Sequence, residues 1–253
     1  MLVSFFTIIL GISATFVSSS WSPSHSSQTP LHLADLRGFD ISGPQTDLNP
    51  NFWRCTFNAG YRKIAIRAYQ QACGQGGRVD PNFVPAYKAA IAAGFNKVDA
   101  YLFPCVGPQP TGIDCKSPRQ QVQELTDTIN KNSMIIDRLW LDIEPTTGVC
   151  NAWQLGNARN LQVAQEWILQ IRETARDWGV YANRNQWEGM FGSLEADVAS
   201  DLPLWAVQAD KVPGVPTVTK LFGGWKSAHA KQYWLDTKTP ECNGSVDLDS
   251  FID

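Results

Sequence analysis

The chain has 253 residues, of which 43% are hydrophobic and 18% are charged. This length and composition fit a globular protein with a sizeable core and exclude an intrinsically disordered chain. The net charge of −3, without a stripe of basic residues, argues against nucleic acid and anionic membranes as partners.

The N-terminus is typical of an export signal. Residues 2–17 form an apolar run followed by three serines, although no Lys or Arg precedes the run. A membrane anchor is the alternative, but a spanning helix usually needs roughly 20 residues. We therefore expect residues 1–20 to be a signal peptide, and the Ser- and Pro-rich residues 21–34 to be a flexible lead-in.

Strand and helix signals alternate through the first half of the chain. Strands are predicted at residues 36–41, 62–69 and 95–103. Two helices are predicted to begin with a capping residue and a proline, at Asp80-Pro81 and at Ser117-Pro118. The first should end at Gly94 and the second near Asn132.

The second half of the chain begins in the same way and then becomes rich in strands. Residues 138–144 predict a buried strand, and the apolar stripe over residues 157–178 predicts the longest helix. Short strands are predicted at residues 179–183, 204–207, 231–234 and 246–251. This order predicts one α/β domain over residues 35–253, a flattened and incomplete TIM-like β/α barrel with a β-rich C-terminal third.

Six cysteines follow the predicted signal: Cys55, Cys73, Cys105, Cys115, Cys150 and Cys242. They form no CxxC pair and lie near no histidine at zinc spacing. In an exported chain an even number of cysteines predicts disulfides, here three. The pairing of Cys105 with Cys115 across a short Pro/Gly loop is the simplest, and the other pairings stay open.

Acids stand near several predicted strand ends, where β/α barrels build their active sites. They are Asp40, Asp142, Glu144, Asp247 and Asp249. The alternative for each is an ordinary turn cap or a solvated carboxylate. The residues LWLDIEP around Asp142 favour function, because acids rarely occur in a buried strand.

Side chains alternate along a strand, so Trp140, Asp142 and Glu144 should face the barrel mouth while Leu141 and Ile143 face outer helices. Two residues advance a strand by about 6.6 Å, which brings the two carboxyl groups near each other. Proximity raises one pKa and keeps one carboxyl protonated as a general acid. Glycoside hydrolysis uses such an acid with a second carboxylate.

Aromatic side chains also lie near the predicted strand ends and could form stacking platforms for sugars. They are Tyr69, Tyr101, Phe103, Trp140, Trp205 and Tyr233. Tyr181 and Asn183 end another predicted strand. The alternative is that they belong to an ordinary aromatic core and a turn.

Taken in order, the fragments RGFDIS, LWLDIEP, GVYAN, PLWAVQAD, AKQYW and VDLDSF resemble the family-25 glycoside hydrolases, the Chalaropsis-type lysozymes or N-acetylmuramidases. The resemblance covers residues 37–251. It implies a flattened, incomplete β/α barrel that hydrolyses the β-1,4 bond between N-acetylmuramic acid and N-acetylglucosamine in bacterial peptidoglycan.

The resemblance also implies roles for individual residues. Glu144 matches the general acid, and Asp142 matches the acid that assists the substrate N-acetyl group. Asp40 and Asp247 match two further acids of the cleft. The implied substrate-binding residues are Tyr181, Asn183, Trp205, Gln232 and Tyr233, to which we add Tyr69 and Tyr101 from their predicted strand ends. No metal or cofactor is implied.

The chain departs from the family pattern in three ways. The cysteines and the insert at residues 103–115 indicate a eukaryotic, disulfide-containing branch. Asp249 stands where many members have Asn, which leaves open whether it or Asp247 faces the cleft, and we prefer Asp247. No wall-binding repeats follow the predicted barrel.

Two other functions remain as alternatives. One is a lectin-like relative that binds peptidoglycan without turnover, and the other is a metal-dependent phosphoester hydrolase whose clustered acids hold the ion. On the preferred interpretation we expect an antimicrobial or digestive monomer in a secreted, lysosomal or phagosomal location. We expect its partner to be peptidoglycan, without stable membrane association after signal cleavage.

Overall fold

The computed structural model describes residues 35–42, 49–239 and 241–252. The predicted signal peptide and lead-in lie outside these residues. Within the described part of the chain, no helix combines the length and the apolar character needed to cross a membrane.

The described residues form a sheet of nine strands, eight of which close into a barrel. Its strands are Leu36–Ile41 (β1), Lys63–Gln70 (β2), Arg78–Val79 (β3), Lys97–Leu102 (β4), Leu139–Ile143 (β5), Trp178–Asn183 (β6), Leu204–Val207 (β7), Ala230–Lys238 (β8) and Ser245–Phe251 (β9). The order around the barrel is β1-β9-β8-β7-β6-β5-β4-β2, and β2 pairs with β1 to close it. The strand β9 runs antiparallel to both of its neighbours, and β3 extends the outer side of β2.

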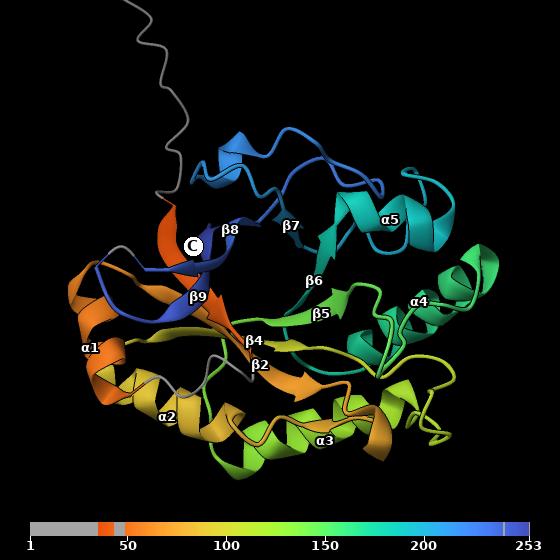
Figure 1. The fold of residues 1–253 in the computed structure, drawn as a ribbon, viewed down its shortest axis with the longest axis horizontal. Helices are drawn as coiled ribbons and strands as arrows, with labels where there is room; N and C mark the ends of the chain where they lie inside the picture. Colours follow the sequence, from red (N-terminus) through yellow and green to blue (C-terminus); the bar gives the residue numbers. More distant parts are fainter. Residues whose placement is uncertain (1–34, 43–48, 240, 253) are drawn as a thin grey trace, which may run out of the picture. The chain divides into compact units, whose positions relative to one another are not determined.

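The helices cover only part of this barrel. They are Pro50–Asn58 (α1), Phe83–Ala93 (α2), Pro118–Lys131 (α3), Asn157–Arg172 (α4) and Arg184–Phe191 (α5). The helices α1 to α3 lie along one side and α4 and α5 along the next, whereas the connection from β7 to β8 contains no α-helix (Figure 1). The predicted α/β barrel with a β-rich C-terminal third is therefore confirmed, and it is incomplete in its helices rather than in its strands.

The helix caps differ in how well they follow the predicted pattern. Ser117 caps α3 as predicted, in a reciprocal capping box with Gln120, and Gly94 ends α2 in a left-handed conformation. The predicted start of α2 at Asp80 is wrong. The Asp80 carboxylate accepts from the Asn82 backbone N–H at 2.9 Å and pairs with Arg67 at 2.8 Å. These bonds form a turn, and the helix begins only at Phe83.

The predicted end of the longest helix is also wrong. The helix α4 ends at Arg172, and Trp178 begins β6 opposite Leu139 of β5. The Trp178 indole N–H donates to the Thr174 hydroxyl at 2.8 Å, which fixes the turn between helix and strand. Pairing with the sheet therefore overrides the helical pattern of residues 173–178.

The two faces of the sheet carry separate hydrophobic clusters, as the alternation of side chains along residues 138–144 predicts. Leu141 and Ile143 join the outer cluster between sheet and helices, while Trp140 lies inside the barrel. The Trp140 ring lies 5.6 Å from that of Trp205. Gly179 makes this packing possible, since a Cβ there would lie 2.3 Å from the Trp140 indole.

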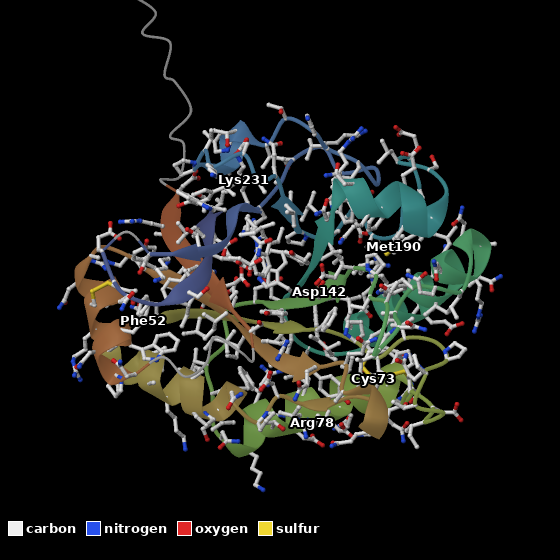
Figure 2. The ribbon with its side chains drawn as sticks, viewed as in Figure 1. Phe52, Cys73, Arg78, Asp142, Met190 and Lys231 are labelled. Carbon is white, nitrogen blue, oxygen red and sulfur yellow. A yellow bond between two sulfur atoms is a disulfide. The ribbon has the colours of Figure 1, made fainter. Side chains whose placement is uncertain are left out.

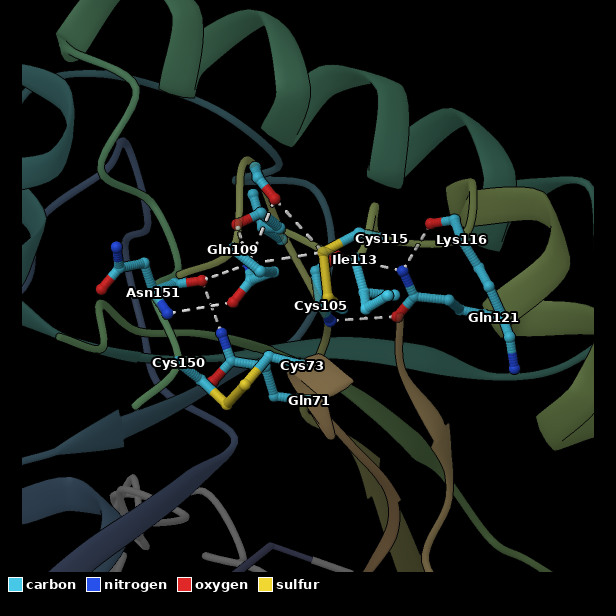
Figure 3. The surroundings of a disulfide bond; sticks show 12 residues. Gln71, Cys73, Cys105, Gln109, Ile113, Cys115, Lys116, Gln121, Cys150 and Asn151 are labelled. Atoms are coloured by element: carbon cyan, nitrogen blue, oxygen red, sulfur yellow. Dashed lines mark hydrogen bonds between the residues drawn. A yellow bond between two sulfur atoms is a disulfide. The ribbon is translucent and has the colours of Figure 1, made fainter. Parts of the chain in front are cut away.

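Three disulfides join the six cysteines: Cys55–Cys242, Cys73–Cys150 and Cys105–Cys115. The predicted number and the predicted Cys105–Cys115 pair are confirmed. Figure 3 shows the last two bonds close together, with the side chains of Gln71 and Gln109 both donating to the Asn151 carbonyl at 2.6 Å. The loop that follows β5 is thus fastened to the loops that follow β2 and β4.

Candidate active site

The C-terminal ends of the barrel strands surround a pocket of about 520 Å³. It is lined by Asp40, Ser42, Arg67, Tyr101, Phe103, Asp142, Glu144, Tyr181, Trp205, Gln232 and Asp247. In Figure 2, Asp142 lies near the middle of the ring of strands. The barrel thus brings together all four predicted catalytic acids, together with Tyr101, Tyr181, Trp205 and Gln232.

The two acids of β5 differ in their surroundings. Asp142 is buried, and its Oδ1 has no hydrogen-bond partner among the described residues. Burial, followed by the charges of Glu144 and Asp40, raises the pKa of Asp142 well above its usual range. Glu144 directly follows the strand and is only partly buried. Burial and then the charge of Asp247 raise the pKa of Glu144 to about 7, while a hydrogen bond with Gln186 opposes the shift.

A chain of hydrogen bonds crosses the floor of the pocket from β6 to β1. The Tyr181 hydroxyl donates to Gln232 Oε1 at 2.9 Å, and Gln232 Nε2 donates to Asp40 Oδ2 at 2.7 Å. Burial and the charge of Asp247 raise the pKa of Asp40 well above its usual range, although the bond from Gln232 opposes this. The orientation of Asp40 is therefore fixed by side chains from β8 and β6, two strands that do not pair with β1.

Of the two acids on β9, Asp247 lines the pocket, in agreement with our preference. Its Oδ1 accepts from the Asp236 backbone N–H at 2.5 Å. Burial raises the pKa of Asp247 to about 6 against the effect of that bond. Asp249 points to the same inner face but is fully buried, and its Oδ1 accepts from the Trp205 indole at 2.9 Å.

Tyr69 does not reach the pocket. In a regular strand, side chains two residues apart face the same side of the sheet, but the register of β2 shifts between Arg67 and Tyr69. The Tyr69 ring is consequently buried in the outer cluster, where its hydroxyl donates to Glu124 of α3 at 2.9 Å.

Tyr233 and Asn183 also lie outside the pocket. Tyr233 follows Gln232 in β8 and so faces the opposite side of the sheet, in the outer cluster. Asn183 caps α5 by accepting from the Asn185 backbone N–H at 2.9 Å, and lines a neighbouring hollow.

Sequence reasoning overlooked Arg67, the cation that lines the pocket. Its Nε donates to the buried Asp80 at 2.8 Å, and its charge opposes the rise in the pKa of Asp142. The available signal was a charged residue inside the apolar run IAIRAY, two positions after the inward-facing Ala65. Ser42 and Phe103 complete the lining. Among the residues described, no three His, Cys, Asp or Glu side chains are grouped as a metal site.

Comparison with known proteins finds similarity to lysozymes and lysozyme-like proteins. The family model described as "Lysozyme-like protein 1" matches residues 37–233. "Lysozyme-like protein 5" of Caenorhabditis elegans is 32% identical over 217 residues, which cover 85% of this chain and 91% of the relative. "Probable GH family 25 lysozyme 5" of Dictyostelium discoideum is 30% identical over 198 residues, or 78% and 82% of the two chains.

Solved structures agree in fold. A family GH25 lysozyme from Aspergillus fumigatus superposes with a TM-score of 0.63 at 20% identity, covering 86% of this chain and 94% of that one. A muramidase from Trichobolus zukalii gives a TM-score of 0.61 at 21% identity, covering 85% and 93%. At these identities the likeness concerns the barrel itself.

Proposed function

The chain belongs to the lysozyme-like protein 1 family and to the family-25 glycoside hydrolases, and from this we propose that its barrel-mouth pocket cleaves bacterial peptidoglycan. The bond cut is the β-1,4 linkage between N-acetylmuramic acid and N-acetylglucosamine. The observation that carries the proposal is the gathering of Asp40, Asp142, Glu144 and Asp247 in one partly enclosed pocket.

Glu144 is the proposed general acid. It directly follows β5 and, unlike the buried Asp142 on the same strand, it is partly exposed, so that a glycosidic oxygen can approach it. With a pKa of about 7, a large share of Glu144 is protonated at neutral pH and nearly all of it in acid. It can therefore transfer a proton to the leaving sugar, which is the role of the acid in glycoside hydrolysis.

Asp142 is the proposed partner of the substrate acetamide. The buried Oδ1 of Asp142 lacks a donor, and an unpaired buried oxygen favours a ligand that supplies an N–H. The acetamido N–H of the sugar is such a donor. Held in this way, the acetamide oxygen could attack the anomeric carbon as Glu144 protonates the leaving group. A covalent glycosyl-enzyme on Asp142, trapped and detected by mass spectrometry, would contradict this route.

The remaining residues of the pocket would hold the sugars. Tyr101, Tyr181 and Trp205 offer aromatic surface, and Gln232 offers an amide beside Asp40. We assign the catalytic domain to residues 35–253 and expect the protein to act as a monomer. Three disulfides support an oxidising location, either secreted or in a lysosomal or phagosomal lumen.

The test compares the wild-type protein with a Glu144→Gln variant, both made with the full chain in an oxidising host. The substitution removes the transferable proton with little change of shape, so the rate of peptidoglycan clearing should fall by about 100- to 10,000-fold. The matched control is Glu166→Gln on the exposed face of α4, which should keep wild-type activity. The released ends should be N-acetylmuramic acid.

Other results would point to a different function. A wild-type protein that binds the wall but releases no reducing ends would be the lectin-like relative. Activity that a chelator abolishes would support metal-dependent chemistry instead. An active Glu144→Gln variant would remove Glu144 from its proposed role.

A further inference from the structure

A second hollow opens at the same end of the barrel as the acidic pocket. It has a volume of about 760 Å³ and is lined by Asn183, Arg184, Asn185, Val207, Gln208, Ala209, Asp210, Lys220 and Leu235. Three of these residues continue the strands that line the acidic pocket. Asn183 lies two residues beyond Tyr181, Val207 two beyond Trp205, and Leu235 three beyond Gln232. The hollow therefore begins about 7 Å further along the same strands.

The charge of this hollow is opposite to that of the acidic pocket. Its one acid, Asp210, accepts from the buried Lys231 at 2.8 Å and from Gln208 at 2.7 Å. Although partial burial opposes the change, these bonds lower the pKa of Asp210 to about 2. The negative charge of Asp210 is thus already matched by Lys231.

Two cations of the hollow have no such match. Among the described residues, neither Arg184 nor Lys220 takes part in an ion pair or a side-chain hydrogen bond. The Arg184 Nε is buried and still lacks an acceptor. A buried donor without an acceptor is costly, and a guanidinium is suited to bind a carboxylate through two parallel hydrogen bonds. The unmatched groups of the hollow therefore favour an anionic ligand.

We propose that this hollow binds a carboxylate carried by a branch of the glycan substrate, an inference that rests on the proposed function. The neighbouring pocket offers such a carboxylate four acids and one cation, Arg67, which is already paired with Asp80, whereas the hollow offers it two unpaired cations. Peptidoglycan has two sources of this group. One is the peptide stem, and the other is the free lactyl acid of a muramic acid that has lost its peptide.

The test measures binding to an Arg184→Gln/Lys220→Gln double variant by titration calorimetry. Three soluble probes are used: a disaccharide with its peptide stem, the same disaccharide with a free lactyl acid, and diacetylchitobiose, which has no carboxylate. The double variant should bind at least one of the two carboxylate-bearing probes about tenfold or more weakly than the wild type does. It should bind diacetylchitobiose as tightly as the wild type does. Loss confined to the first probe identifies the peptide, and loss confined to the second identifies the lactyl acid.

The matched control is Arg54→Gln/Lys226→Gln, which removes the same charges from two exposed positions outside both cavities. Equal binding of all three probes by wild type and the Arg184/Lys220 double variant would overturn the inference, as would an equal loss for all three. Hydrolysis is scored separately. A wild-type protein that does not cleave peptidoglycan, but whose binding of a carboxylate probe depends on Arg184 and Lys220, contradicts the proposed function alone. A protein that cleaves peptidoglycan, but whose binding does not depend on these two side chains, contradicts this inference alone.

Discussion

Asp249 illustrates how a single residue can support the site without lining it. It is fully buried, Trp205 holds its Oδ1, and no N–H or O–H donor reaches its Oδ2. The Asp40 carboxyl lies close enough to raise the pKa of Asp249, and two neighbouring carboxyl groups can share a hydrogen bond only when one of them is protonated. Burial and the charge of Asp40 raise the pKa of Asp249 well above its usual range. We infer that Asp249 carries the proton and donates it to Asp40.

An Asp249→Asn variant should therefore keep both hydrogen bonds and most of the activity. The raised pKa means that the folded wild type binds more protons than the unfolded chain once the pH exceeds about 4, so its stability declines as the pH rises. Because Asn does not titrate, the stability of the variant should fall less steeply than that of the wild type as the pH rises. Thermal unfolding followed by circular dichroism from pH 4 to 8 measures the slope, with the exposed Asp127→Asn as control. An unchanged slope would show that Asp249 is not the protonated partner.

At the scale of secondary-structure elements, the sequence indicates most strands and helices but not all of their ends. The strands 36–41 and 204–207 match the structure to the residue, because turn-forming residues bound them clearly. The helices α1 and α5 were not predicted, since each is short. The end of α4 was missed because its helical pattern continues into residues that pair with β5.

The errors in the site have a similar origin. A strand pattern gives the face of a side chain only while the register is regular. The shift in β2 sends Tyr69 outward, and no local sequence signal marks it. Tyr233 could have been excluded from the sequence, because it and Gln232 are neighbours on one strand and cannot share a face. Arg67 was detectable in the same way, as a charge on the inward face of an apolar strand.

The helix α3 offers a prediction at this scale, because its start depends on one side chain. The Ser117 hydroxyl accepts from the Gln120 backbone N–H at 3.2 Å, and the Gln120 side chain accepts from the Ser117 N–H at 3.1 Å. Ser117→Ala removes the first bond and should lower the free energy of unfolding by about 1 kcal/mol. Urea denaturation measures the loss, and Ser227→Ala at an exposed position is the control. Equal stability of the two variants would indicate that water replaces the cap.

At the scale of the whole molecule, the Cys55–Cys242 bond joins elements that are far apart in the sequence. It ties α1 to the turn between β8 and β9, across a separation of 187 residues. The Arg37–Glu241 ion pair at 2.7 Å lies beside it and is exposed, so it adds little. This disulfide therefore joins the N-terminal and C-terminal parts of the barrel sequence, which the other two disulfides do not.

A Cys55→Ser/Cys242→Ser variant should lose about 2 to 5 kcal/mol of unfolding free energy, because the unfolded chain regains the freedom that the loop removes. The initial rate of peptidoglycan clearing at 25 °C should stay the same, since neither cysteine lines the acidic pocket. Urea unfolding and the clearing assay give the two values. A large fall in activity without a loss of stability would mean that the bond shapes the site rather than the fold.

The position of β9 determines when the barrel can form. It follows every other strand in the chain, yet it lies between β8 and β1 and carries Asp247. Until residues 245–251 have left the ribosome, β1 and β8 each keep an open edge, which is the condition under which newly made β-proteins aggregate. We therefore expect the yield of this protein in a cell to depend on how well those two edges are shielded until synthesis of β9 is complete.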